Sequence, residues 1–394
     1  MKYDFDQLTI RRGSGSVKWD EAVPLPEAGT SLPSVDDVIP LWVADMDFLA
    51  APAIRSAISR RAEHGIFGYA LVDDSYYDAV ISWFRRRHDW TIRRDEILYT
   101  TGVVPALSAT IKALTMPGER VLTLSPAYNC FFSSIRNNGC EVLESALQRV
   151  GDSFEIDFAD VERQCADPKT TLFLLCNPHN PTGRVWTPGE LQQLDDICQR
   201  HGVVVVSDEI HCELVMPGYH YQPFAAVSEA CRQNSVVLTS PSKSFNTAGL
   251  QIANIITAQS EWRRRIDRAI NINEVCDVNP FGPVALKAAY NESEDWLDQL
   301  NEYLWGNYQT LLDYAAVHQP SWRVCRLEGT YLPWVDVTAT GMTSQAYADL
   351  LLTQSRVRVN PGTMYGQETG AGYVRLNIAC PRSRLTEALQ RIAT

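Results

Sequence analysis

Four apolar segments in the middle of this chain of 394 residues constrain its fold more than any other feature. They read RVLTLSP at 120–126, TTLFLLCNP at 170–178, GVVVVSDE at 202–209 and SVVLTSP at 235–241. Such continuous aliphatic and β-branched runs are typical of strands buried on both faces. Residues 187–202 between them predict a helix, because Thr187 suits its cap, Pro188 its first turn and Gly202 its end. Buried strands that alternate with helices predict an α/β fold with a mostly parallel sheet.

Each of the four segments closes with a polar side chain. These residues are Ser125, Asn177, Asp208 and Ser240. The carboxyl ends of parallel strands meet at one edge of a sheet, and ligands bind there in open α/β folds. The sequence therefore predicts a binding site along this edge.

The chain after residue 281 has a different pattern. A long amphipathic helix is expected over 294–317, and shorter strand-like segments follow at 322–329, 331–337, 356–362 and 372–380. This pattern predicts a smaller α+β domain. We expect an N-terminal arm that joins the small domain at 1–45, a large domain at 46–280 and the small domain at 281–394.

Composition excludes several classes of partner. The net charge of -12 would repel nucleic-acid phosphates and anionic lipid surfaces. No run of eighteen apolar residues predicts a membrane span, and the N-terminus lacks the apolar core of a signal peptide. The ten cysteines contain no C-x-x-C spacing, so we expect free thiols, no metal site and a cytoplasmic protein.

Lys243 and Asp208 are the two charged residues that need an explanation. Lys243 lies among hydroxyl residues in TSPSKSFNTAGL (239–250), directly after a predicted buried strand. Taken alone, a solvated turn explains it. Asp208 follows four valines, and burying a carboxylate costs several kcal/mol unless a cation meets it. A helix cap or an ion pair would satisfy Asp208 equally well.

Further polar and aromatic features occur at the same predicted edge. Residues 99–107 run from a strand end into a helix, whose first amides form an anion site in many proteins, although ordinary helix starts look the same. Tyr128 follows a strand end, where its ring could cover a flat ligand or simply join the core. The proline-rich loop CNPHNPTGRVW (176–186) fixes Asn177.

Together these features form the set that pyridoxal 5'-phosphate requires. The helix start, with Ser240 and Ser242, would hold its phosphate, and Tyr128 would stack on its ring. Asp208 would pair with its ring nitrogen, and Lys243 would join its aldehyde as a Schiff base.

Motifs along nearly the whole chain resemble the fold-type I pyridoxal-phosphate enzymes of the aspartate aminotransferase superfamily. Within them the chain is most similar to the cystathionine β-lyase (C–S lyase) group of MalY/PatB type. The motifs are LWVADMDF (41–48), FGYA (67–70), GVVPAL (102–107), NPHNPTGRVW (177–186), SDEIH (207–211), SKSFNTAGL (242–250), EGTYLPWVD (328–336) and YVRLNIACPR (373–382). NPHNPTG, SDEIH and SKSFN in combination are highly specific. The resemblance implies a large domain with a seven-stranded type of sheet, and a homodimer.

The resemblance also implies roles for individual residues. The residues that would hold the cofactor are Tyr69, Gly102, Val103, Val104, Tyr128, Asn177, Asp208, His211, Ser240, Ser242 and Lys243. Lys243, Asp208 and Tyr128 would be catalytic, and Tyr69 would reach the phosphate from the neighbouring subunit. Arg375 would bind the substrate carboxylate, with Val43 and Asn177 also at the substrate.

The implied reaction is β-elimination, in which L-cystathionine or a related cysteine S-conjugate yields a thiol, pyruvate and ammonia. One departure is Gln251, eight residues after Lys243, where aminotransferases usually carry an arginine that grips the phosphate. We expect modest cofactor affinity as a result. Two alternatives stay open, a class I/II aminotransferase and a cofactor-binding regulatory protein with little turnover. The sequence does not identify the sulfur substituent.

Overall fold

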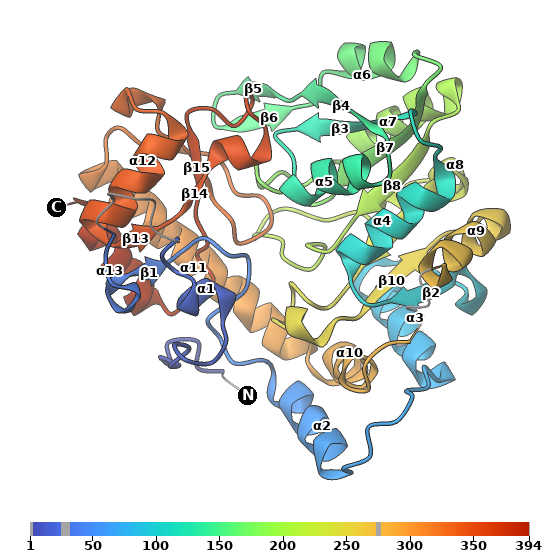
Figure 1. Cartoon of the computed structure of the whole chain (residues 1–394), viewed down its shortest axis with the longest axis horizontal. Helices are drawn as coiled ribbons and strands as arrows, with labels where there is room; N and C mark the ends of the chain where they lie inside the picture. Colours follow the sequence, from blue (N-terminus) through green and yellow to red (C-terminus); the bar gives the residue numbers. More distant parts are fainter. Residues whose placement is uncertain (1–2, 25–31, 273–276, 394) are drawn as a thin grey trace.

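The central element of the fold is a sheet of seven strands, seen in a computed structural model that describes residues 3–24, 32–272 and 277–393 (Figure 1). In spatial order the strands are β2 (Ile97–Thr100), β10 (Ala253–Ile256), β9 (Ser235–Thr239), β8 (Val204–Asp208), β7 (Thr170–Cys176), β3 (Arg120–Ser125) and β4 (Glu141–Ala146). Strand β10 pairs antiparallel with both of its neighbours, and the other pairs are parallel. The predicted mostly parallel sheet is confirmed.

Helices cover both faces of this sheet because its strands are apolar on both sides. In β7, Leu172 and Leu174 pack with one group of helices, whereas Phe173 and Leu175 pack with the other. The first group is α4 (Val103–Leu114), α5 (Asn129–Asn137) and α9 (Ser260–Asn271). The second is α6 (Phe158–Cys165), α7 (Pro188–His201) and α8 (Glu229–Gln233).

Local sequence sets the ends of α7 as expected. The Thr187 hydroxyl accepts the amide of Glu190, and the Glu190 carboxylate accepts the amide of Thr187, which forms a capping box. Pro188 occupies the first turn. Gly202 ends the helix with a left-handed φ of 70° that favours glycine.

The C-terminal part forms a second, smaller α+β unit. Its helices are α11 (Glu294–His318), α12 (Ser344–Leu350) and α13 (Arg382–Ala393), whereas α10 (Phe281–Glu292) packs against α2 (Pro52–Glu63) and α3 (Asp74–His88). Its sheet has the order β11 (Arg323–Val324), β12 (Trp334–Asp336), β15 (Tyr373–Arg375) and β14 (Asn360–Pro361). The strands are shorter than the apolar segments predicted. After Arg375, for example, Leu376 and Asn377 donate to different partners, Pro333 and Leu41.

The N-terminal part lies against this second unit. Strand β1 (Ile39–Pro40) pairs parallel with β13 (Val357–Arg358). The remaining α-helices and strands are α1 (Val17–Asp20), α2 (Pro52–Glu63), α3 (Asp74–His88) and the hairpin of β5 (Gln148–Val150) and β6 (Ser153–Glu155). Within the three described ranges, no helix has the length and apolarity needed to cross a membrane.

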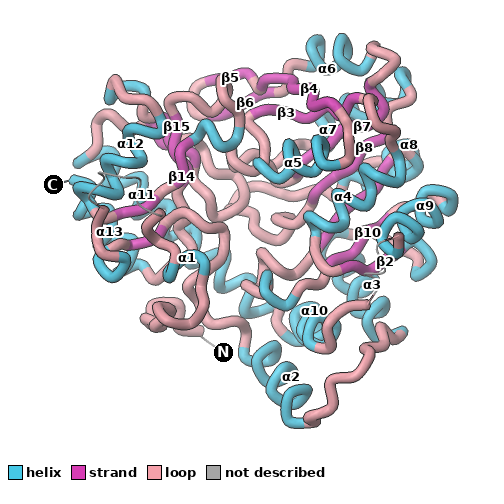
Figure 2. The backbone as a smooth tube through the Cα atoms, in the orientation of Figure 1, coloured by secondary structure: helices cyan, strands magenta, loops and turns pink. Residues whose placement is uncertain are grey.

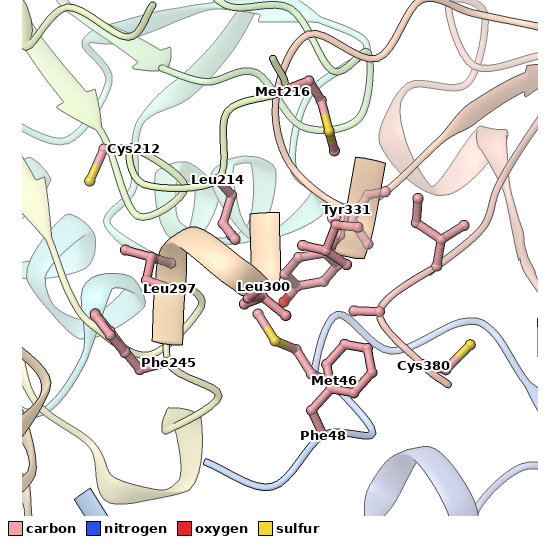
Figure 3. Packing of buried hydrophobic residues seen from close by; sticks show 14 of the residues in the cluster. Met46, Phe48, Cys212, Leu214, Met216, Phe245, Leu297, Leu300, Tyr331 and Cys380 are labelled. Carbon is pink, nitrogen blue, oxygen red and sulfur yellow. The ribbon is translucent and has the colours of Figure 1, made fainter. Parts of the chain in front are cut away.

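One apolar cluster joins the N-terminal segment, the large sheet and the C-terminal unit. Figure 3 shows Met46 and Phe48 of the N-terminal segment beside Leu300 of α11 and Tyr331. Loops fill the region between the two sheets (Figure 2). Because all three parts of the chain contribute residues to this cluster, its packing holds the N-terminal segment beside the loops between the two sheets.

Candidate active site

A cavity of about 510 Å³ lies at the carboxyl ends of the parallel strands. Residues that follow β2, β3, β7, β8 and β9 line one side, and residues from the N-terminal and C-terminal parts line the other. The predicted site residues among its lining are Val43, Gly102, Val103, Val104, Tyr128, Asp208, His211, Ser242, Lys243 and Arg375. The fold therefore gathers most of the predicted set in one place.

Asp208 and Lys243 face this cavity with strongly shifted pKa values. Burial raises the pKa of the Asp208 carboxyl to about 7, although the Ile210 amide (3.1 Å) and Lys243 act in the opposite direction. Burial, and then the positive charge of Arg375, lower the pKa of Lys243 to about 8. The carboxyl thus needs a cation to ionise fully, and the amine loses its proton more readily than an exposed lysine.

The start of α4 provides donors for an anion. The first backbone bond of this helix runs from the Ala106 amide to the Gly102 carbonyl at 2.9 Å. The amides of Val103 and Val104 precede that bond, so they have no partner within the helix, and both residues line the cavity. Ser242 and Gln251 line the same cavity.

Ser240 takes a different position from the one expected. Its hydroxyl donates to the Ile252 carbonyl at 2.7 Å and accepts the Ser242 amide at 3.1 Å. Ser240 is outside the cavity lining, so its hydroxyl serves the turn that carries Ser242.

Tyr128 and His211 form part of the wall. Tyr128 precedes α5 and is half-buried, and burial is the main cause that raises its pKa. His211 is buried, and burial followed by Lys243 and Arg375 lowers its pKa well below 6.5, so the ring is neutral. Among the described residues, its Nδ1 atom has no hydrogen-bond partner. A ligand in the cavity could supply that partner.

Asn180, which the sequence reasoning missed, takes the position expected for Asn177. The Asn177 amide nitrogen donates to the Gln222 carbonyl at 3.0 Å, and Asn177 is outside the lining. Asn180 lines the cavity, and its Oδ1 accepts Arg375 Nη1 at 3.0 Å. Both asparagines precede a proline in NPHNP, so the motif itself offers no signal that separates them.

Arg375 is oriented by contacts around its guanidinium. Its Nη2 donates to the Trp42 carbonyl at 3.1 Å, and its guanidinium carbon lies 4.7 Å from the Tyr365 ring centre. Its Nε is buried with no partner in the described parts of the chain. A buried guanidinium held in one orientation is suited to a carboxylate.

Tyr69 does not join this cavity within its own chain. It belongs to the loop between α2 and α3, and its side chain is 97% exposed.

These residues fit pyridoxal 5'-phosphate. The amides of α4 suit its phosphate, and the buried Asp208 carboxyl suits a cationic ring nitrogen. The Lys243 amine suits its aldehyde, and the unpartnered Nδ1 of His211 suits a polar ring substituent.

Comparisons with known proteins agree with this geometry. The family described as "Aminotransferase class I and II" matches residues 36–392. Cystathionine β-lyase PatB of Bacillus subtilis (strain 168) is 38% identical over 389 residues, which are 99% of this chain and 98% of that protein. The chain therefore belongs to the class I and II aminotransferase family.

Two solved structures show the same architecture. Cystalysin from Treponema denticola, which contains a pyridoxal 5'-phosphate cofactor, is 32% identical with a TM-score of 0.94, over 100% of this chain and 98% of that one. The pyridoxal-phosphate-bound C–S lyase from Staphylococcus hominis, in complex with the inhibitor L-cycloserine, is 30% identical with a TM-score of 0.92 over the same shares. The fold is that of fold-type I pyridoxal-phosphate enzymes.

Proposed function

We propose that this chain is a pyridoxal 5'-phosphate-dependent C–S lyase that cleaves L-cystathionine or a related cysteine S-conjugate. The observation that carries the proposal is one cavity that holds a buried acid, Asp208, an amine of lowered pKa, Lys243, and an oriented guanidinium, Arg375. The names of the relatives, cystathionine β-lyase and C–S lyase, support this reaction.

The cofactor residues divide between its phosphate and its ring. The amides of Val103 and Val104 after Gly102, with Ser242, would hold the phosphate, and Ser240 supports Ser242. Tyr128 covers the ring face, and His211 faces a polar ring substituent. When bound, the cofactor withdraws electrons from the α-carbon of the substrate.

Asp208 and Lys243 handle the protons. Asp208 keeps the ring nitrogen protonated, because a cation beside a buried carboxylate stabilises both charges. Lys243 would hold the cofactor through its side-chain amine, and its free amine would take the α-proton of the substrate. It must be neutral for this step, and its pKa of about 8 favours the neutral form more than that of an ordinary lysine.

Arg375 and Asn180 bind the carboxylate of the substrate amino acid, and we move to Asn180 the role first given to Asn177. Val43 and Tyr365 line the same cavity and contact the substrate side chain. Elimination expels the sulfur as a thiol, and hydrolysis of the remaining three-carbon unit gives pyruvate and ammonia. From L-cystathionine the thiol is homocysteine.

The decisive test incubates the cofactor-loaded protein with L-cystathionine and no keto acid. We expect free thiol and pyruvate in equal amounts. Lys243→Ala should abolish turnover and change the cofactor's visible absorbance, whereas Ser75→Ala, on α3, should leave both unchanged. Product that forms only after a keto acid is added would identify an aminotransferase instead.

We also propose that the protein is a homodimer in which Tyr69 reaches the cofactor phosphate of the neighbouring subunit. The loop around it exposes Ile66, Phe67 and Leu71 at 68%, 57% and 84%, which is typical of a surface that a partner covers. Mixing Tyr69→Ala with Lys243→Ala subunits should restore activity, because one site of each hybrid then has both native residues. Hybrids without restored activity would place Tyr69 elsewhere.

Two further assignments complete the proposal. We place the protein in the cytoplasm, since all nine cysteines in the described ranges are free thiols. We retain the division at 1–45, 46–280 and 281–394, and the pairing of β1 with β13 supports the attachment of the arm to the small domain.

A further inference from the structure

The segment 42–48, called here the strap, has no helix or strand structure, and its residues 42–44 line the proposed active site. Its backbone oxygens cannot use a regular ladder, so they need other donors. Side chains supply these donors along the strap. The oxygens of Trp42, Val43, Ala44, Asp45, Met46 and Phe48 all accept side-chain hydrogen bonds.

On its inner side the strap holds the two basic groups of the site. Lys243 Nζ donates to the Ala44 carbonyl at 2.6 Å, and the Tyr331 hydroxyl donates to the same oxygen at 2.9 Å. Arg375 Nη2 donates to the Trp42 carbonyl at 3.1 Å. The positions of these two oxygens therefore set where the amine and the guanidinium lie.

On its outer side the strap is held by charged groups of the N-terminal segment. Lys18 Nζ, with a side chain 0% exposed, lies 3.0 Å from Asp47 Oδ2 and donates to the Asp45 carbonyl at 3.1 Å. Trp19 Nε1 donates to Asp47 Oδ1 at 2.8 Å, and Arg11 pairs with both Asp45 and Asp47 at 2.6 Å.

Burying these charged groups on the outer side of the strap costs free energy unless each group is paired with an opposite charge or a hydrogen-bond partner. Burial by itself would raise the pKa of Asp47, but Lys18, Trp19 and Arg11 outweigh it and lower that pKa. Removing one partner of a buried ion pair leaves the other charge uncompensated. The paired groups of this cluster hold the strap in position, although Asp45 Oδ1 is buried with no hydrogen-bond partner in the described parts of the chain.

Apolar and amide contacts hold the middle of the strap. Met46 and Phe48 are buried and point toward α11 and Tyr331 (Figure 3). Asn246, three residues after Lys243, accepts the Met46 amide at 3.0 Å and donates to the carbonyls of Met46 and Phe48. The strap therefore links the buried charge cluster rigidly to the segment that carries Lys243.

We propose that Lys18 and Asp47 are positioning residues, which act through the strap to hold Ala44 O against Lys243 and Trp42 O against Arg375. The inference rests on the proposed function, in which Lys243 moves the proton and Arg375 binds the carboxylate. Neither Lys18 nor Asp47 lines the cavity of about 510 Å³, and the hydrogen bonds that connect them to Lys243 and Arg375 run through the strap. Asp47 does line an adjacent cavity that Lys243 also borders. A displacement of about 1 Å in such groups is enough to lower catalysis substantially.

The test compares Lys18→Met and Asp47→Asn with a matched control, Glu96→Gln. Glu96 is also a buried carboxylate, with a side chain 4% exposed and paired with Arg93 and Arg232, but it lies before β2, at the other end of that strand from the cavity. The cofactor-loaded proteins are compared by hydrogen exchange of the Met46 and Asp47 amides, by the pH midpoint of the cofactor's visible absorbance, and by kcat and KM.

In both Lys18→Met and Asp47→Asn, the amide hydrogens of Met46 and Asp47 should exchange at least about tenfold faster than in the wild type. The reason is that the hydrogen bonds donated by these two amides loosen. The absorbance midpoint should rise by about half a pH unit, because water admitted beside a buried nitrogen favours its protonated form. KM should rise about tenfold as Arg375 loses its orientation. Glu96→Gln should change none of the three.

Unchanged exchange and an unchanged absorbance midpoint in Asp47→Asn, which keeps an oxygen for Trp19, would overturn the proposal even if Lys18→Met does not fold. Exchange and absorbance do not depend on the substrate. If the wild type cleaves no carbon–sulfur bond but the strap variants still shift both readouts, the proposed function fails and the positioning role stands.

Discussion

The burial of Asp208 predicts that a single substitution stabilises the cofactor-free protein while it weakens cofactor binding. The substitution is Asp208→Asn, which keeps an oxygen for the Ile210 amide and removes the charge. The carboxyl has a pKa of about 7 in the folded protein and 3.8 as a free group. The folded state therefore binds this proton more tightly than the unfolded state.

The sign of the effect follows from that difference. A raised folded-state pKa stabilises the protein below 3.8, and the contribution is lost as pH rises through about 7. The shift of about three pH units corresponds to about 4 kcal/mol in the free energy of unfolding, at about 1.4 kcal/mol per unit. Asp208→Asn does not titrate, so its advantage over the wild type should grow from about pH 4 to about pH 7 and then level off.

Urea unfolding of both cofactor-free proteins at several pH values measures this difference. The matched control is Asp313→Asn, an exposed carboxylate on α11, which should give no advantage that grows with pH. Adding pyridoxal 5'-phosphate should reverse the order, since only Asp208 offers the ring nitrogen a negative charge. A difference that stays constant across pH, or a cofactor-free variant that is less stable at about pH 8, would refute the reasoning.

Three other substitutions test how the cavity binds its ligands. Asn180→Ala should raise KM about tenfold with little change in cofactor affinity, because it removes a partner of Arg375. Asn177→Ala should instead lower the unfolding midpoint and leave KM close to the wild type, and steady-state kinetics and thermal unfolding separate the two results. Gln251→Arg should lower the cofactor dissociation constant about tenfold, because it adds a charge-assisted contact to the phosphate. Equilibrium dialysis measures this constant. An unchanged constant would show that the side chain at 251 does not reach the phosphate.

Much of the site was predictable because local sequence patterns indicate where each strand begins and ends. The apolar runs marked β3, β7, β8 and β9, and parallel pairing then placed Asp208 and the residues after β9 at one edge. The start of α4 was also predictable as a candidate anion site, since Gly102 precedes an apolar helix. These predictions needed no knowledge of which distant segments touch.

The contacts that differ from the prediction depend on the orientation of individual side chains. Asn177 and Asn180 are equivalent in the sequence, and the turn between their prolines alone decides that Asn180 enters the cavity. Ser240 follows a strand as predicted, but its hydroxyl donates a hydrogen bond to the Ile252 carbonyl. Residue type alone does not predict which of several nearby groups will accept or donate a hydrogen bond.

By itself, the sequence determined the layered α/β fold and the edge where its polar residues gather, because hydrophobic periodicity and strand direction are local properties. Only the tertiary structure decided that backbone oxygens of the strap hold the amine and the guanidinium. Lys243 lies 199 residues from Ala44, and Arg375 lies 333 residues from Trp42. A backbone carbonyl is the same in every residue, so its role appears only when folding brings a donor to it.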